Sequence, residues 1–160
     1  VVNDKAYHNE TFMQDTKVHD GIFEILEFLK KKKVRLGIIT LRSKEMAYNV
    51  TSGLGLDKYM DITIAGGEVP MNKPSGYPIV YACSKFGIMP SKSVMVGDST
   101  VDIICGKDAG AKSIGVLWGS DSEDELRKAG ADMIVRSPKE LKELFSRFLG
   151  LSEIETIRQK

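Results

Sequence analysis

Residues 94–111, VMVGDSTVDIICGKDAGA, combine the pattern of a short strand with that of a helix. An apolar run rich in Val ends at Gly97, and such a run is typical of a buried strand. Asp98 follows it directly, and a second carboxylate, Asp102, stands four residues later. The stretch therefore predicts a buried strand that delivers two acids to its carboxyl end, at the start of a helix.

The same alternation continues along most of the chain. Strands are predicted at 34–40, 62–65, 93–98, 112–119 and 133–136, and helices at 21–32, 44–53, 78–87, 100–109, 122–129 and 138–149. Ser43 is a candidate helix cap, and Ser137 before Pro138 is another. Short Val- and Ile-rich strands separated by helices favour right-handed βαβ units. The expected fold class is α/β, with a Rossmann-like parallel sheet sandwiched by helices.

Composition and net charge limit the classes of function that this sequence can have. The 160 residues suit one domain, and 23 basic against 22 acidic side chains leave a charge of +1, which gives no electrostatic case for nucleic acid or membrane partners. No apolar run is long enough to span a bilayer. Cys83 and Cys105 lie among apolar residues, so we expect buried reduced thiols and a cytoplasmic protein. The lysines at 30–33 are interpreted as a solvated helix end.

Polar side chains follow several predicted strands at their carboxyl ends. They are Thr40, Lys73, Asp98 with Asp102, and Gly119 with Ser120. In parallel sheets this edge carries the ligand site, so we expect these groups to gather there. A hydroxyl and helix N–H groups hold phosphate, a lysine neutralises it, and two carboxylates suit Mg²⁺. Together these groups would stabilise a transferring phosphoryl group.

Each of these residues also has a purely structural interpretation. Thr40 at a strand end is typical of a cap, and Lys73 before a proline is typical of a solvated loop. Asp98 and Ser99 could cap the helix at 100–109. Taken singly, the structural interpretation is favoured for each residue. Their joint order, all at strand ends, favours a phosphate and metal site.

Three motifs in this order resemble those of the haloacid dehalogenase superfamily, within its phosphoglycolate-phosphatase-like branch. The matching stretches are GIIT (37–40), NKPSGYP (72–78) and VMVGDSTVDI (94–103), and the likeness extends over about residues 7–148. The stretches AGAKSIGVLWG and AGADMIVRSPKEL are similar to later strands of the same branch. The resemblance implies that Thr40 binds phosphate, that Lys73 steadies phosphate and an aspartyl nucleophile, and that Asp98 and Asp102 hold Mg²⁺.

Two stretches depart from the family pattern. The third motif usually continues Lys-Pro-x-Pro, whereas here Lys73-Pro74 is followed by Ser75-Gly76-Tyr77-Pro78, which predicts a different loop. Leu41-Arg42 replaces the small or amide residue common after the second motif, and Arg42 is a candidate substrate contact together with Leu41.

The family's first motif, Asp-x-Asp-Gly-Thr, does not occur in the chain. Asp20-Gly21 is preceded by Lys17 and His19, and Asp4 has Ala6 where the second acid should stand. The resemblance places the missing strand centrally, between the strand ending at Thr40 and the strand ending at Asp98. Its absence predicts two half-sheets with exposed inner edges.

The resemblance also divides the chain. Residues 1–20 are expected to be a remnant of a helical cap and its return linker, 21–150 an incomplete core, and 151–160 a C-terminal helical tail. Three explanations of the missing strand stay open. The chain is a fragment, a second chain or swapped copy supplies the strand, or the domain has rearranged and lost catalysis.

The leading hypothesis is a Mg²⁺-dependent phosphatase that hydrolyses a small phosphorylated metabolite through an aspartyl-phosphate. This chain would be its core without the nucleophile, inactive alone. The alternative is a non-catalytic protein that binds phosphate or Mg²⁺, or regulates, on the same scaffold. A receiver-like signalling domain fits poorly, because the acidic pair and the phosphoacceptor before Thr40 are missing.

Overall fold

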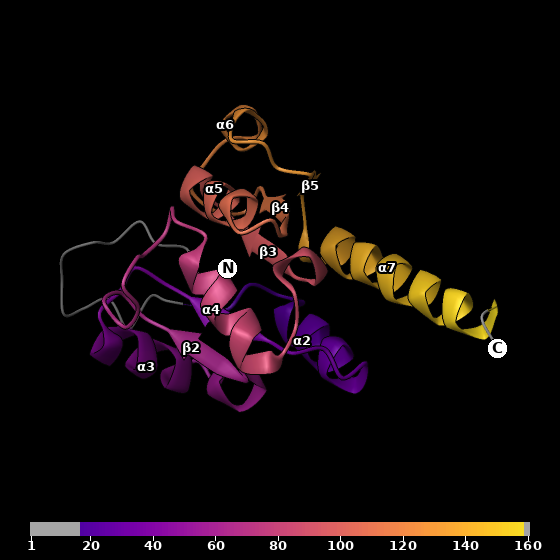
Figure 1. Cartoon of the computed structure of the whole chain (residues 1–160), viewed down its shortest axis with the longest axis horizontal. Helices are drawn as coiled ribbons and strands as arrows, with labels where there is room; N and C mark the ends of the chain where they lie inside the picture. The colour runs from indigo at the N-terminus through magenta and orange to yellow at the C-terminus, as the bar shows by residue number, and fades with distance from the viewer. Residues whose placement is uncertain (1–16, 159–160) are drawn as a thin grey trace.

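The structure, a computed structural model, describes residues 17–158 (Figure 1). Its strands form two separate parallel sheets. The first pairs β1 (Gly37–Ile39) with β2 (Ile62–Ile64), and the second has the order β3 (Val94–Gly97), β4 (Lys112–Val116), β5 (Met133–Val135). The predicted α/β class, with parallel strands flanked by helices, is confirmed.

The division into two sheets falls where the sequence predicted it. β1 pairs with β2 from Gly37 opposite Ile62, and β3 pairs with β4 from Val94 opposite Lys112. Among residues 17–158, no strand pairs with the second edge of β1 or of β3. The two inner edges therefore each present backbone groups that no strand of the described chain uses.

The helices lie close to their predicted positions. They are α2 (Ile22–Lys31), α3 (Lys44–Gly53), α4 (Tyr77–Phe86), α5 (Thr100–Asp108), α6 (Glu123–Lys128) and α7 (Pro138–Arg158), with short 3-10 turns η1 (Asp57–Tyr59) and η2 (Pro90–Lys92). The predicted caps form: Ser43 accepts from the Met46 N–H at 3.4 Å, and Ser137 accepts from the Glu140 N–H at 3.2 Å. No helix within the described residues is long and apolar enough to cross a membrane.

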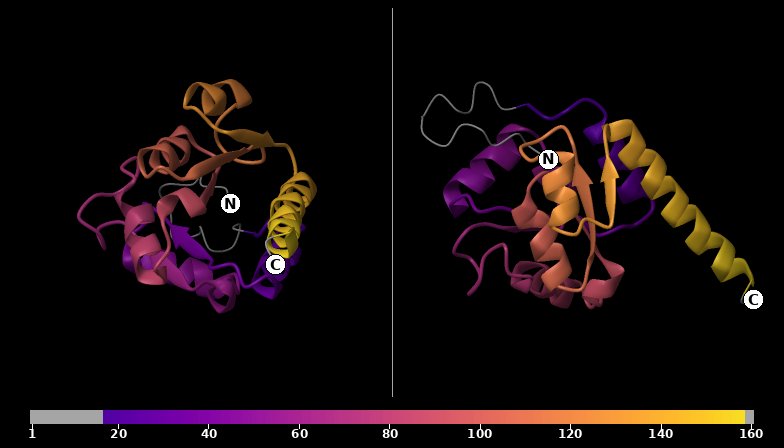
Figure 2. Two further views of the ribbon diagram at one scale, coloured as in Figure 1. Left: turned by 45° about the vertical axis from the view of Figure 1, so that its right-hand side comes forward. Right: turned by 90° about the horizontal axis from the view of Figure 1, so that it is seen from above.

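The last helix is longer than the sequence pattern predicted. The expected end at 149 does not appear, and α7 continues without a break through Arg158, so most of the expected 151–160 tail belongs to it. Figures 1 and 2 show α7 beside α2 at its start and extending away from the rest of the chain at its end. Of the expected cap remnant, residues 1–16 lie outside the described part.

Two apolar clusters hold the sheets together. One is built from α2, α7 and the second sheet, and its buried members are Ile25, Leu29, Ile114, Val116, Val135 and Leu141. Both Leu36, next to β1, and Val96, in β3, pack against it. Because each fully buried side chain of this size contributes about 1.5–3 kcal/mol, this shared cluster is a strong link between the sheets.

The second cluster lies under α4 and α5. Its buried residues are Ile79, Cys83, Cys105 and Ala111, and Ile39 of β1 and Met95 of β3 pack against it. Both cysteines are buried and unbonded, as predicted. Burial raises the pKa of the Cys105 thiol to about 11, which keeps it protonated and unreactive.

Lys30, in the 30–33 run, has a specific partner. Asp61 accepts hydrogen bonds from Lys30 Nζ at 3.1 Å, from Arg35 at 3.0 Å and from the Leu36 N–H at 2.8 Å. The interpretation of the whole run as a solvated helix end therefore fails for Lys30, because its ammonium reaches a carboxylate 31 residues away. This contact ties the end of α2 to the start of β1 and β2.

Candidate functional site

Asp98 and Asp102 flank the junction between β3 and α5. Ser99 caps α5 in a reciprocal arrangement, in which its side chain accepts from the Asp102 N–H and the Asp102 side chain accepts from the Ser99 N–H. A Cβ at Gly97 would lie 2.2 Å from the Cβ of Asp102, so only glycine leaves room for this carboxylate against the strand end. The structural cap and the candidate site thus use the same residues.

Lys73 reaches this junction from the loop between β2 and α4. Its Nζ lies 2.5 Å from Asp102 Oδ1, and the two side chains are only 11% and 8% exposed. The loop is fixed at its far end, where the Gly76 N–H donates to Asp108 Oδ2 at 2.6 Å. The interpretation of Lys73 as a solvated loop residue is therefore wrong, and the structure brings it to the acids as the motif order predicted.

Asp102 is already engaged through both carboxylate oxygens. Oδ1 accepts from Lys73, and Oδ2 accepts from the Ser99 hydroxyl at 2.9 Å. A cation at this position must therefore share these oxygens or contact Asp102 through water. Mg²⁺ keeps several of its waters when protein-bound, so the arrangement is compatible with it.

Asp98 is held by the loop that follows β4. The Ser120 N–H donates to Asp98 Oδ2 at 2.9 Å. The pKa of the Asp98 carboxyl lies above its usual value, because burial raises it, the Ser120 hydrogen bond opposes this, and the charge of Asp102 raises it further. A positive charge beside Asp98 would act against this upward shift of its pKa.

Thr40 lies at the end of β1, in the other sheet. Its Oγ1 accepts from the Arg42 N–H at 3.2 Å, and its own N–H donates to Ile64 O at 3.0 Å. Gly66 packs closely against this turn. A Cβ at position 66 would lie 2.5 Å from the Leu41 carbonyl oxygen. Leu41 is 49% exposed. Among the described residues, no hydrogen bond joins Thr40 to Lys73 or Asp98.

The residues present fit a hard cation in kind but form only part of a site. Carboxylate oxygens are suitable ligands for Mg²⁺. Among residues 17–158, however, no group of three or more His, Cys, Asp or Glu side chains is arranged to hold a metal ion. Asp98 and Asp102 would hold one side of such a cation.

Two features of the site were not predicted from the sequence. Gly119 and Ser120 were expected after a strand, but their contact with Asp98 was not expected. Asp121, whose Oδ2 accepts from the Thr100 N–H at 2.7 Å, was not predicted to take part. The only local signal was the position just beyond β4.

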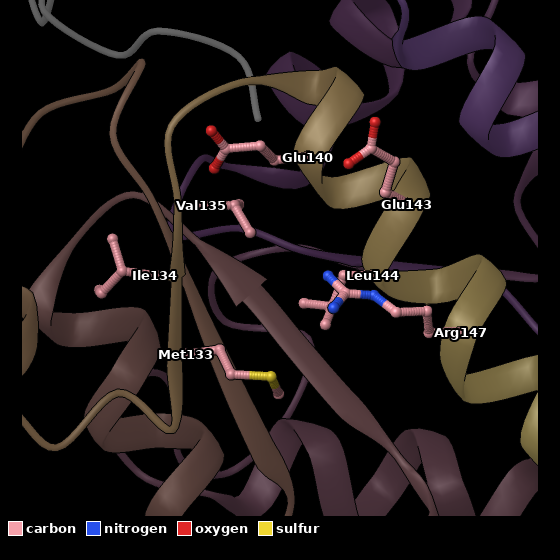
Figure 3. A pocket seen from close by; sticks show the side chains of 7 residues that line it. All are labelled: Met133, Ile134, Val135, Glu140, Glu143, Leu144 and Arg147. Carbon is pink, nitrogen blue, oxygen red and sulfur yellow. The ribbon is translucent and has the colours of Figure 1, made fainter.

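A separate pocket of about 320 Å³ lies between β5 and α7. Glu140, Glu143 and Arg147 face it (Figure 3), and it shares no residue with this site.

The structure is a parallel α/β fold with a buried lysine–aspartate pair and a further acid near its strand ends. The family of haloacid dehalogenase-like hydrolases matches residues 3–116 of this sequence. The chain belongs to that family.

Known proteins of the family are similar over most of the chain. A Clostridium perfringens protein with the provisional name pyrophosphatase PpaX is 36% identical over 120 residues, covering 75% of this chain and 56% of its own length. The phosphoglycolate phosphatase of Nitrosococcus oceani is 29% identical over 141 residues, covering 88% and 63%. This chain therefore spans roughly six tenths of these curated relatives.

A solved structure shares the fold. It is a phosphatase from Clostridium acetobutylicum, assigned by inference, with 28% identity and a TM-score of 0.77, and the match covers 86% of this chain and 64% of that one. The structural match supports the family membership and the arrangement of the strands.

Proposed function

We propose that the protein containing this chain is a Mg²⁺-dependent phosphatase that hydrolyses monoesters of small phosphorylated metabolites through an aspartyl-phosphate. The observation that carries the proposal is the buried Lys73–Asp102 pair beside Asp98, at the carboxyl end of a parallel strand. Family membership and relatives named as phosphatases support it. The buried unbonded cysteines support a cytoplasmic location.

The residues of this chain take distinct roles in the proposal. Lys73, held by Asp102, presents its ammonium to the phosphate oxygens and neutralises charge that develops during transfer. Thr40 offers its hydroxyl to phosphate, next to the N–H of Arg42. Leu41 and Arg42 follow directly and would contact the rest of the substrate. Asp98 and Asp102 would hold Mg²⁺, whose charge stabilises the phosphoryl oxygens.

The attacking carboxylate must come from a further strand. β1 and β3 each have one edge that pairs with no strand within residues 17–158. Both strands belong to parallel sheets. We propose that a strand carrying the nucleophile adds there, supplied by the rest of a longer protein, by a second chain or by a swapped copy. Such a strand would complete one sheet and bring an acid between Thr40 and Asp98.

The direct test is Mg²⁺-dependent release of p-nitrophenol from p-nitrophenyl phosphate, measured for the full-length protein, for residues 1–160 alone and for Asp98→Ala. We expect turnover only from the first, abolished by a chelator and restored by Mg²⁺. A full-length protein that has no Mg²⁺-dependent turnover would contradict the enzyme assignment.

We also propose an alternative function, that of a non-catalytic protein that binds phosphate esters or Mg²⁺ on the same scaffold through Lys73, Asp98 and Asp102. This alternative predicts heats of Mg²⁺ binding that Asp98→Ala removes, with no phosphate release. Calorimetry beside the turnover assay separates the two functions.

A further inference from the structure

The loop 119–121 follows β4 and binds Asp98. It forms hydrogen bonds with both the side chain and the backbone of Asp98. The Ser120 N–H donates to Asp98 Oδ2 at 2.9 Å, and the Asp121 N–H donates to the Asp98 carbonyl at 3.0 Å. The Ser120 hydroxyl lies 3.2 Å from the same carbonyl oxygen. Residues 22 positions apart in the sequence are therefore fixed to each other by several hydrogen bonds.

Gly119 allows the loop to approach this closely. A Cβ at position 119 would lie 2.1 Å from both the Cβ and Oδ2 of Asp98, well inside any real contact distance. The backbone of Gly119 is outside the left-handed region, so a side chain is excluded by space alone. Any larger residue must push the Asp98 carboxylate away from its present position.

Asp121 anchors the other end of the loop. Its Oδ2 accepts from the N–H of Thr100, the first residue of α5, at 2.7 Å. Asp102 lies two residues further along α5 and pairs with Lys73. The loop therefore spans from Asp98 to the helix that carries the other candidate ligand, and it sets the two carboxylates relative to each other.

We propose that the loop 119–121 is a positioning device for Asp98, which occupies Oδ2 with a main-chain N–H and thereby directs Oδ1 toward the cation. The hydrogen bond from the Ser120 N–H is made to Oδ2 of this carboxylate. Ser120 and Asp121 are positioning residues because they act through Asp98. This inference rests on the proposed function, in which Asp98 holds Mg²⁺.

The first test compares Mg²⁺ binding to the full-length protein by calorimetry in matched glycine variants. Gly119→Ala should weaken Mg²⁺ binding about tenfold or more, the range typical of residues that orient metal ligands. Gly150→Ala is the control, because a Cβ there meets no atom within 4 Å, and its affinity should equal that of the wild type. Trp118, the sole tryptophan, precedes the loop, so its fluorescence in metal-free protein should change in Gly119→Ala only.

The second test introduces no larger side chain, so it remains informative if Gly119→Ala does not fold. Asp121→Ala and Asp121→Asn both remove the charge, but only Asp121→Asn keeps an acceptor for the Thr100 N–H. Asp121→Ala should bind Mg²⁺ roughly threefold more weakly than Asp121→Asn, about the effect of one lost hydrogen bond.

The outcomes separate this inference from the function on which it rests. Asp98→Asn is the reference, and Mg²⁺ binding equal to wild type in that variant would remove the proposed metal site itself. If Asp98→Asn abolishes binding but Gly119→Ala retains it, or if the two Asp121 variants bind equally, the positioning role is wrong and the metal site stands.

Discussion

Lys73 and Asp102 form a buried ion pair across 29 residues of sequence, with Nζ 2.5 Å from Oδ1. The pair joins the loop before α4 to the first turn of α5. Both side chains are almost fully covered, at 11% and 8% exposed, so neither charge is screened well by solvent. The site and the stability of the fold therefore depend on the same contact.

Lys73→Met should destabilise the protein by about 3–5 kcal/mol, because it leaves the Asp102 charge buried without a partner. Urea denaturation of the single variants and of Lys73→Met/Asp102→Asn measures the coupling. The double variant should lose clearly less than the sum of the two single variants. Additive losses would mean that the two groups do not interact in solution.

Asp61 should give a pH-dependent contribution to stability. Burial acts to raise its pKa, but hydrogen bonds from the Leu36 N–H, Lys30 and Arg35 outweigh it and lower the pKa from 3.8. A lowered carboxyl pKa means that the stabilisation is present above the ordinary value and is lost as pH falls through the lowered one. Asp61→Asn should therefore cost about 1–3 kcal/mol at neutral pH, and the cost should shrink in acid.

The measurement for Asp61 is the free energy of unfolding of wild type and variant across that pH range. Asp57→Asn is a suitable control, because Asp57 lies on the nearby turn η1 and is exposed. Its effect should be small at every pH. A difference between wild type and Asp61→Asn that stays constant into acid would argue against the ion pairs with Asp61.

Gly76→Ala should destabilise the packing of α4 on α5. A Cβ at position 76 would lie 2.3 Å from the backbone nitrogen of Ala109, and backbone cannot move aside cheaply. We expect a cost of about 2 kcal/mol, seen as a lower melting temperature, from overpacking of this kind. Gly150→Ala should not lower the melting temperature, because Gly150 lies inside α7, where alanine is the better helix former. A melting temperature for Gly76→Ala equal to wild type would show that the two helices separate easily.

Thr40→Val tests the proposed phosphate contact. Valine keeps the shape but removes the oxygen that accepts from the Arg42 N–H. Binding of inorganic phosphate to the full-length protein, measured by calorimetry, should weaken about tenfold, with a stability loss near 1 kcal/mol. Thr40→Ser should retain most of the affinity. Equal phosphate affinities of Thr40→Val and wild type would remove Thr40 from the site.

The sequence predicted every helix and strand of residues 17–158 that forms part of the sheet layers, within a few residues except at the end of α7. The spacing of hydrophobic residues, the Ser caps and the Gly or Pro residues at element ends are local signals. They can be recognised in the sequence without knowledge of the fold. The last helix was predicted to end at 149 and to be followed by a separate helical tail, whereas α7 continues unbroken to Arg158.

The candidate site was predictable only in part. The position of a strand end depends on neighbouring residues, whereas a side-chain contact depends on residues far apart in the sequence. The sequence placed Lys73, Asp98 and Asp102 at strand ends, and the structure brings Lys73 onto Asp102. It could not predict that Asp102 already uses both oxygens, or that Lys30 pairs with Asp61. Those depend on which side chains meet when distant segments pack.

The sequence by itself determined the alternation of strands and helices, and it determined that acids, a lysine and a threonine follow the strands. Only the tertiary structure decided which apolar side chains from both sheets pack into shared clusters. Only the tertiary structure placed Ser120 and Gly119 against Asp98. The physical reason is that backbone periodicity is set by neighbouring residues, whereas a close contact such as Gly119 on Asp98 is set by how whole elements pack.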